Sequence, residues 1–435
     1  MIPIPDLYLV RQTAPQPTVT DVAAEVREQW LQSAVAKRIK PGHRIAVGCG
    51  SRGIKNLGLI MKTTIQTLQE LGAKPFVVAA MGSHGGATPE GQRELLANYE
   101  IDEPHLGVPV LTDMDADVIG TNSWDEPVWW DRNALQADGV VTVSRIKPHT
   151  DFRGRYESGI VKMAVIGLGK RDGASQHHRW GWRGLKDMMV ESMTVILEKT
   201  KFLGGLGILE NAQEETAELT VVDRDALLDQ EPVLLDRARE LMGRLPFDQL
   251  DVLIVGEVGK NYSGAGIDPN VVGRLLIEAA PELETNKPKI TRMGALDVSP
   301  ESHGNGTGIG IADLTTERAL AAIDPGPFRM NNLTARFLWR SKLPIAFATD
   351  REVIENCIDT CWQPFADRVR FAIIPNTLEV AELWVSKPLA DEARGKPGLT
   401  VTAEGRPLPF DPKGNVVQET LFPHSVRGRR AHGSV

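Results

Sequence analysis

Short apolar segments alternate with segments of helical periodicity along the first half of the chain. Strands are predicted where the apolar runs are short, at residues 43–49, 75–80, 108–111, 139–143 and 163–166. Helices are predicted at the periodic stretches 54–71 and 89–99, and Thr88 and Pro89 form the start signal of the second. This order of strand, turn, helix and strand is typical of βαβ units and a mainly parallel sheet.

A second set of elements begins near residue 245. Apolar runs predict strands at residues 249–256, 369–374 and 380–385. We therefore predict two α/β domains with mainly parallel sheets and an interdomain cleft. The N-terminal domain is expected at residues 1–245 and the C-terminal domain at 246–390. A tail at 391–435, rich in Pro, Gly and Arg, is expected to fray at its end and in part to pack back on the N-terminal domain.

Charge and cysteine content exclude several classes of protein. Lys and Arg total 49 against 57 Asp and Glu, a net charge of −8, which argues against the basic face of a nucleic-acid-binding protein. Three cysteines cannot build a disulfide scaffold or a four-ligand zinc ribbon. We see neither a signal peptide nor an apolar run of about 18 residues, so we expect a cytoplasmic protein without a membrane partner.

Two loops that directly follow predicted strands carry histidines. His84 lies in the glycine-rich segment 81–86, and His149 lies in the segment 144–151, Ser-Arg-Ile-Lys-Pro-His-Thr-Asp. Loops at the carboxyl ends of parallel strands form ligand sites, so both histidines are candidates for acid/base chemistry near neutral pH. The plainer interpretation, a histidine in an exposed turn and a solvated charged loop, stays open at this point.

Cationic side chains gather around these loops. Lys147 and Arg153 flank His149, a density that suits a carboxylate or phosphate ligand. Ser51 and Arg52, in the turn before the first helix, could add donors to backbone N–H groups that bind phosphate. The turn matches neither the dinucleotide-binding nor the Walker motif.

Lys162 lies at the edge of an apolar run, and the pair His177-His178 follows it. Neighbouring helical side chains diverge by about 100°, so only one of the two histidines can face a site. An imidazole can ligate nickel, zinc or iron, and a packed or exposed histidine is the alternative. In the second domain, Asn270 and Arg274 follow a glycine-rich loop that either faces the cleft or simply makes tight turns.

The order of these features resembles the lactate racemase family. The resemblance rests on a turn with an arginine, a Gly-Ser-His loop, a Pro-His pair, a lysine about a dozen residues on and a histidine sixteen residues after it: Arg52, His84, His149, Lys162 and His178. It extends over about residues 45–385.

The resemblance implies a cofactor and roles for these residues. The cofactor is a nickel-pincer nucleotide, pyridinium-3,5-bisthiocarboxylic acid mononucleotide nickel, carried by the N-terminal domain. By position, Lys162 would tether it, His178 would ligate nickel with His177 as the alternative, and His84 and His149 would be the acid/base pair. Contacts to the cofactor would come from Ser51, Arg52 and Lys147, and contacts to the substrate from Arg52, Arg153, Asn270 and Arg274.

The implied activity is racemisation or epimerisation at C2 of a 2-hydroxy acid by proton-coupled hydride transfer to and from this cofactor. The expected partner is the small-molecule substrate, without nucleic acid or membrane, and a homo-oligomer stays open. The chain departs from the family in having Cys49-Gly50-Ser51 before Arg52 and Gly85-Gly86 after His84. With the added cations, these departures favour a larger or more polar substrate such as a sugar acid. The alternatives are another isomerase of hydroxy or sugar acids and a non-catalytic ligand-binding protein of the same fold.

Overall fold

The computed structural model describes residues 3–50, 53–280, 282 and 286–431. The chain forms two compact units. One, the N-terminal unit, comprises Gln16–Met242, and the other, the C-terminal unit, comprises Met1–Pro15 and Gly243–Val435. Within the described residues, none of the helices has both the length and the apolar character needed to span a bilayer.

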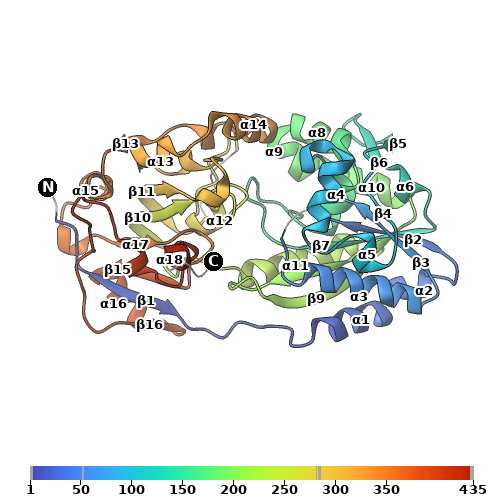
Figure 1. Cartoon of the computed structure of the whole chain (residues 1–435), viewed down its shortest axis with the longest axis horizontal. Coiled ribbons are helices and arrows are strands. Elements are labelled where there is room, and N and C mark those ends of the chain that lie inside the picture. The colour runs from blue at the N-terminus through green and yellow to red at the C-terminus, as the bar shows by residue number, and fades with distance from the viewer. Residues whose placement is uncertain (1–2, 51–52, 281, 283–285, 432–435) are drawn as a thin grey trace. The chain divides into compact units, whose positions relative to one another are not determined.

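The N-terminal unit is built on a mainly parallel sheet with the strand order β4-β3-β2-β7-β8-β9 (Figure 1). Its strands are β2 (Arg44–Cys49), β3 (Lys74–Ala79), β4 (Val110–Leu111), β7 (Gly139–Arg145), β8 (Phe202–Glu210) and β9 (Thr216–Asp223). All pair in parallel except β9, which is antiparallel to β8. A separate hairpin pairs β5 (Ala116–Thr121) with β6 (Pro127–Asp131).

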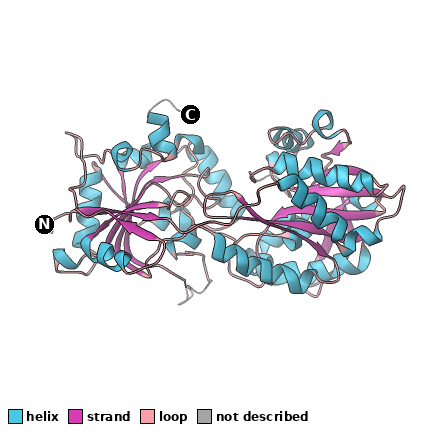
Figure 2. Ribbon diagram, turned by 90° about the horizontal axis from the view of Figure 1, so that it is seen from below, coloured by secondary structure: helices cyan, strands magenta, loops and turns pink. Residues whose placement is uncertain are grey.

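Helices lie on both faces of this sheet (Figure 2). They are α1 (Val22–Gln32), α2 (Ala34–Arg38), α3 (Leu57–Glu70), α4 (Pro89–Ala97), α5 (Glu103–Leu106), α6 (Arg132–Leu135), α7 (Ile160–Lys162), α8 (Lys170–Arg179), α9 (Gly181–Arg183), α10 (Met189–Lys199) and α11 (Leu227–Leu241). A 3₁₀ turn, η1 (Gly85–Ala87), and two π-helical stretches, η2 (Met163–Gly167) and η3 (Gly184–Met188), complete the set. Apolar side chains of α1 and α3 pack on β2 in one core, in which the indole N–H of Trp30 donates to Thr64 Oγ1 at 3.0 Å.

The C-terminal unit contains a mixed sheet with the order β13-β12-β11-β10-β14-β15-β1-β16. Its strands are β1 (Leu7–Gln12), β10 (Gln249–Val258), β11 (Lys289–Val298), β12 (Leu314–Thr316), β13 (Ile345–Phe347), β14 (Phe371–Ile374), β15 (Glu382–Ser386) and β16 (Leu399–Val401). Its helices are α12 (Pro269–Val272), α13 (Glu317–Ala321), α14 (Pro325–Ala335), α15 (Asp350–Asp359), α16 (Lys387–Arg394), α17 (Gln418–Leu421) and α18 (Val426–Ala431). The 3₁₀ turns are η4 (Pro300–Ser302), η5 (Ile309–Ile311), η6 (Trp339–Ser341) and η7 (Ala366–Arg368).

The α/β fold predicted from the sequence is confirmed in both units. The N-terminal sheet is parallel except for β9, and the C-terminal sheet has four parallel and three antiparallel pairs among its described strands. The strand predicted at residues 163–166 is wrong, because these residues form the π-helical stretch η2. Three of them, Ala164, Val165 and Ile166, are buried, and a short apolar run has the same pattern in a buried strand and a buried helix.

Two parts of the chain lie elsewhere than the sequence led us to expect. Residues 7–12 form β1, which pairs with β15 and β16 and so belongs to the C-terminal unit. The tail also belongs to this unit, because β16 completes its sheet and the indole N–H of Trp384 donates to the carbonyl of Leu421 at 3.0 Å. Pairing between strands almost 400 residues apart leaves no local signal in the sequence.

Candidate functional site

The strand order places a topological switch point in the middle of the N-terminal sheet. From β2 the chain adds β3 and β4 on one side and later β7 and β8 on the other (Figure 1). In open α/β sheets, ligands bind outside the carboxyl ends of the strands at such a point. Gly50 follows β2, and the loops after β3 and β7 carry His84 and His149, respectively. These residues therefore follow three adjacent strands.

These loops converge on one helical segment, residues 160–179, formed by α7, η2 and α8. A methyl group in place of the Gly50 hydrogen would lie 2.8 Å from Met163 Cε. The N–H of Gly82, which has a φ of +57°, donates to the carbonyl of Gly167 at 3.1 Å. The lysine and both candidate metal-binding histidines lie on this same segment.

His149 and Lys162 are in direct contact. The Nζ of Lys162 lies 2.5 Å from Nε2 of His149. The backbone N–H of Asp151 donates to Nδ1 of His149 at 3.1 Å, and an Asp151 carboxylate oxygen lies 3.7 Å from the same nitrogen. Phe152 stacks on the imidazole with a centroid distance of 4.6 Å.

The hydrogen bonds of the His149 ring relate its tautomer to the protonation state of Lys162. When Nδ1 accepts the Asp151 N–H, a neutral imidazole carries its proton on Nε2. In that tautomer Nε2–H would donate to a neutral Lys162 amine, and in the other tautomer Nε2 would accept from the lysine. A neutral amine is the nucleophilic form of lysine.

His84 lies at the start of η1 and is exposed. Its backbone is held by α4, because Nε2 of the buried Gln92 donates to the carbonyls of Gly82 at 3.0 Å and His84 at 3.2 Å. Thr88 caps α4 as predicted, with Oγ1 accepting the Gly91 N–H at 3.1 Å. The loop is therefore anchored at both ends.

The adjacent histidines of α8 have different environments. His177 is 2% exposed, its Nδ1 lies 2.8 Å from the Gly173 carbonyl, and its Nε2 lies 3.1 Å from Ser192 Oγ. His178 is half-buried, and its Nδ1 donates to the Ala174 carbonyl at 2.7 Å. A backbone hydrogen bond of this kind fixes the tautomer in which Nε2 has the lone pair, as in metal-ligating histidines. Both ring nitrogens of His177 are thus engaged, Nδ1 within α8 and Nε2 with Ser192 of α10.

Acidification is expected to destabilise the protein through His177. Burial lowers the pKa of His177 to about 4, so below about pH 6.5 the unfolded chain binds a proton that the folded chain does not. Stability from this group is complete above pH 6.5 and is lost as the pH falls towards 4. We expect the free energy of unfolding to fall by about 2 kcal/mol more in the wild type than in H177Q between pH 7 and 5. Urea titrations measure this, and equal losses in the two proteins would contradict it.

Glu231 of α11 is a buried carboxyl beside the start of the lysine-bearing segment. It is 1% exposed, and its Oε2 accepts the Val161 N–H at 2.9 Å. Burial raises the pKa of Glu231 to about 7, although the hydrogen bond from the Val161 N–H lowers it. Its role was not predicted, because in the sequence it is one acid in a charged helix.

Alkaline pH is expected to destabilise the protein through Glu231. The folded chain holds the carboxyl proton up to about pH 7 and the unfolded chain only to about 4.5, so stability is complete at low pH and falls as the pH rises through this window. Between pH 5 and 8 the wild type should lose about 2 to 3 kcal/mol relative to E231Q. E240Q, an exposed position on the same helix, is the control and should follow the wild type in urea titrations at both pH values.

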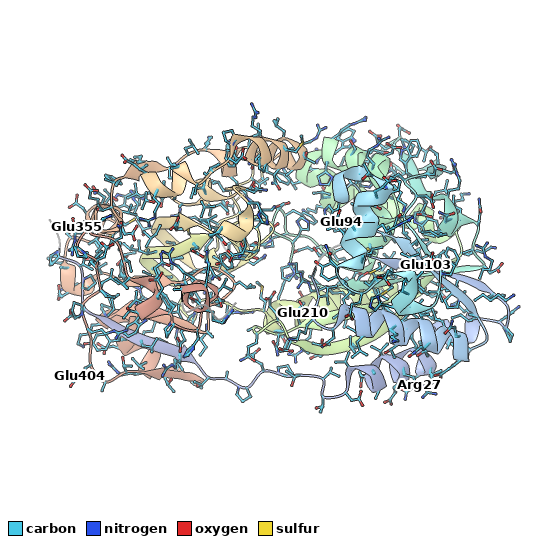
Figure 3. All side chains as sticks on the ribbon, in the orientation of Figure 1. Arg27, Glu94, Glu103, Glu210, Glu355 and Glu404 are labelled. Carbon is cyan, nitrogen blue, oxygen red and sulfur yellow. The ribbon has the colours of Figure 1, made fainter. Side chains whose placement is uncertain are left out.

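The cations near His149 are engaged to different degrees. Arg145, at the end of β7, forms an ion pair with Glu210, which is labelled in Figure 3 and also accepts the Lys55 N–H at 2.8 Å. Arg153 donates to the His149 carbonyl at 2.7 Å, and the backbone of Lys147 pairs with Ser158. The charge of Arg145 is therefore balanced by Glu210 at the end of the neighbouring strand β8. Lys147 and Arg153 belong to the loop that carries His149.

The predicted residues of the second domain belong to the C-terminal unit. Arg274 donates to the carbonyls of Ile290 and Ile311 at 2.8 and 3.0 Å and pairs with Asp313 at 3.0 Å. The side-chain amide of Asn270 donates to Asp268 at 2.9 Å, within the turn that starts α12. These contacts favour a structural role for both side chains. Ser51 and Arg52 lie outside the described residues.

Sequence reasoning missed the carboxylates that hold the site together. Glu157 is buried and accepts the His149 N–H at 2.6 Å, and Asp151 contacts the imidazole. Both lie within eight residues of His149, so the acids of that loop were a usable signal. The third carboxylate, Glu231, lies 70 residues from its partner Val161, so no pattern in the sequence indicated this contact.

Comparison with known proteins gives a family match. A family model for the lactate racemase N-terminal domain matches residues 3–185. The lactate racemase apoprotein from Thermoanaerobacterium thermosaccharolyticum matches with 11% identity and a TM-score of 0.42, covering 56% of this chain and 61% of that one. A protein of known structure from Thermotoga maritima matches with 13% identity and a TM-score of 0.47, covering 82% of this chain and 90% of that one. No curated protein matches the sequence.

Proposed function

Because this chain belongs to the lactate racemase family through its residues 3–185, we propose that it is an isomerase that inverts C2 of a 2-hydroxy acid with the help of a nickel-pincer nucleotide. The observation that carries the proposal is the 2.5 Å contact between His149 and Lys162, on elements that meet at the switch point of the sheet. An acid/base imidazole beside a nucleophilic amine is unusual for a purely structural loop.

The donor set fits this cofactor. A neutral Lys162 amine could form the covalent link to the nucleotide, and the Nε2 lone pair of His178 could complete the nickel coordination. When bound, the nucleotide would supply the redox step at the C2–H bond of the substrate, which amino-acid side chains do not perform. Lys147 and the turn at residues 51–52 are the proposed further contacts to it.

The side chains of this protein handle the protons. The link to the nucleotide would engage the Lys162 amine and release Nε2 of His149 from it. In the other tautomer the ring proton lies on Nδ1, where it would face the Asp151 carboxylate 3.7 Å away in place of the Asp151 N–H. In that tautomer His149 would accept the substrate hydroxyl proton at Nε2. The Asp151 charge then stabilises the imidazolium, and the same proton returns to the oxygen in the reverse step. His84, on a different loop, would do this for the opposite enantiomer. The carboxylate of the substrate would bind Arg153, with Arg52 as a further proposed contact.

The test uses protein produced in cells that synthesise the cofactor. We expect one nickel per chain and interconversion of the enantiomers of at least one acid in a panel of 2-hydroxy acids and sugar acids, followed by chiral chromatography. Substrate deuterated at C2 should keep its deuterium in the product, because the hydrogen does not pass through water. Turnover of lactate alone would contradict a larger substrate. Nickel-loaded protein without turnover of any acid would favour the non-catalytic alternative.

A further inference from the structure

The loop that carries His149 is built around a buried carboxylate. Its ends are joined by backbone hydrogen bonds between Lys147 and Ser158 at 3.1 and 3.2 Å. The Glu157 side chain is fully buried inside it. Its Oε2 accepts the His149 N–H at 2.6 Å and its Oε1 accepts the Gly154 N–H at 3.0 Å. Glu157 therefore holds the backbone of His149 directly.

The charge of Glu157 is balanced from another element. Nη2 of Arg239, on α11, lies 2.6 Å from Glu157 Oε1 and 3.3 Å from the Gly154 carbonyl. A buried carboxylate without a cation would be costly, because desolvation disfavours its charged form. Arg239 thus supplies the cation that balances the buried carboxylate of this loop.

The same helix supports the segment that carries Lys162. Glu231, two turns before Arg239 on α11, accepts the Val161 N–H at 2.9 Å. The contact with Gly159 is so close that an added methyl group would lie 2.4 Å from Glu231 Oε1. Helix α11 therefore contacts both the loop that carries His149 and the turn that presents Lys162.

We propose that Arg239, acting through Glu157, is a positioning residue that sets the contact between the His149 imidazole and Lys162. Through its contacts with Glu157 and the Gly154 carbonyl, it would act by fixing the backbone of His149 relative to α11. The proposal deepens the proposed function and rests on it for its kinetic consequence, whereas the geometric consequence is independent of any activity.

The test replaces the guanidinium without shortening the side chain much. R239M removes the donors to Glu157, and R239K retains a cation. R237M is the matched control, because Arg237 lies on the same helix, is similarly exposed (39% against 35%) and forms its ion pairs with Glu218 and Glu240, away from the His149 loop. E157Q is a second variant, since its NH₂ group would face an N–H donor at either position, the His149 N–H at one and the Gly154 N–H with Arg239 at the other.

The first readout needs neither cofactor nor substrate. In protein with ¹⁵N-labelled histidine, the ring nitrogens of His149, assigned with H149Q, report the tautomer. We expect the wild type and R237M to show mainly the Nε2–H form, and R239M and E157Q to show a mixture, with R239K closer to the wild type. Identical spectra in all these folded proteins would overturn the proposal.

The second readout is kinetic. With the cofactor loaded, kcat of R239M should fall about 10- to 100-fold with KM changed less than about threefold, because a displaced catalytic group costs rate more than binding. R237M should keep the wild-type kcat. If the wild type proves inactive but the histidine spectra change as expected, the proposed function fails and the positioning role stands. A changed thermal midpoint with unchanged spectra and kcat would mean that Arg239 only stabilises the fold.

Discussion

Replacing His149 by Ala is expected to lower kcat for the isomerisation by about 10²- to 10⁴-fold, the usual contribution of a positioned general acid/base. The variant keeps Lys162 and His178, so nickel content should stay at one per chain. The loss would follow from the removal of the atom that takes the hydroxyl proton, which lies 2.5 Å from Lys162. Initial rates in both directions and metal analysis of the same samples measure both expectations.

The equilibrium constant between two enantiomers is one, so kcat/KM must fall equally in both directions for H149A. H84A should behave in the same way, because each direction uses both bases in turn. His105 provides the matched control: it is an exposed histidine of the same unit whose Nδ1 lies 2.7 Å from Asp102. H105A should retain wild-type rates. Equal activity of H149A and H105A would remove His149 from the reaction.

Local patterns in the sequence were enough to predict most strands of the N-terminal sheet. The segments around β2, β3 and β7 are short and apolar. Glycine-rich turns follow β2 and β3, and a polar loop follows β7, so the apolar pattern and the loop residues indicate the same elements. The same reasoning placed His84 and His149 after neighbouring strands. It failed at Met163–Gly167, where a buried helical stretch has no polar face to reveal its period.

Contacts between distant residues could not be predicted in the same way. The pairing of β1 with β15 and β16 assigns the N-terminus to the C-terminal unit, and no composition signal marks it. The different surroundings of His177 and His178 could not be predicted either, because the partner of His177, Ser192, lies 15 residues away on another helix. The bond between Arg239 and Glu157 spans 82 residues and depends on how α11 packs.

The second large effect is expected at His178. H178A should lose nickel affinity by more than about 100-fold, since removing a ligand costs more than removing its hydrogen-bonded partner, which itself costs 10- to 100-fold. The protein should still fold, because His178 is only half-buried and its Nδ1 donates to a backbone carbonyl of its own helix, that of Ala174. Metal analysis after dialysis against a weak chelator, together with a thermal melt, measures both properties.

H177Q is the matched variant, because it changes the neighbouring histidine on the same turn of α8. It should keep its nickel but unfold more easily at pH 7, because both ring nitrogens of His177 are used inside the protein. The two variants therefore separate metal binding from packing: one loses nickel at wild-type stability, and the other loses stability with its nickel in place. The reverse pattern would assign the metal to His177 and would require α8 to turn by about 100° from the orientation described above.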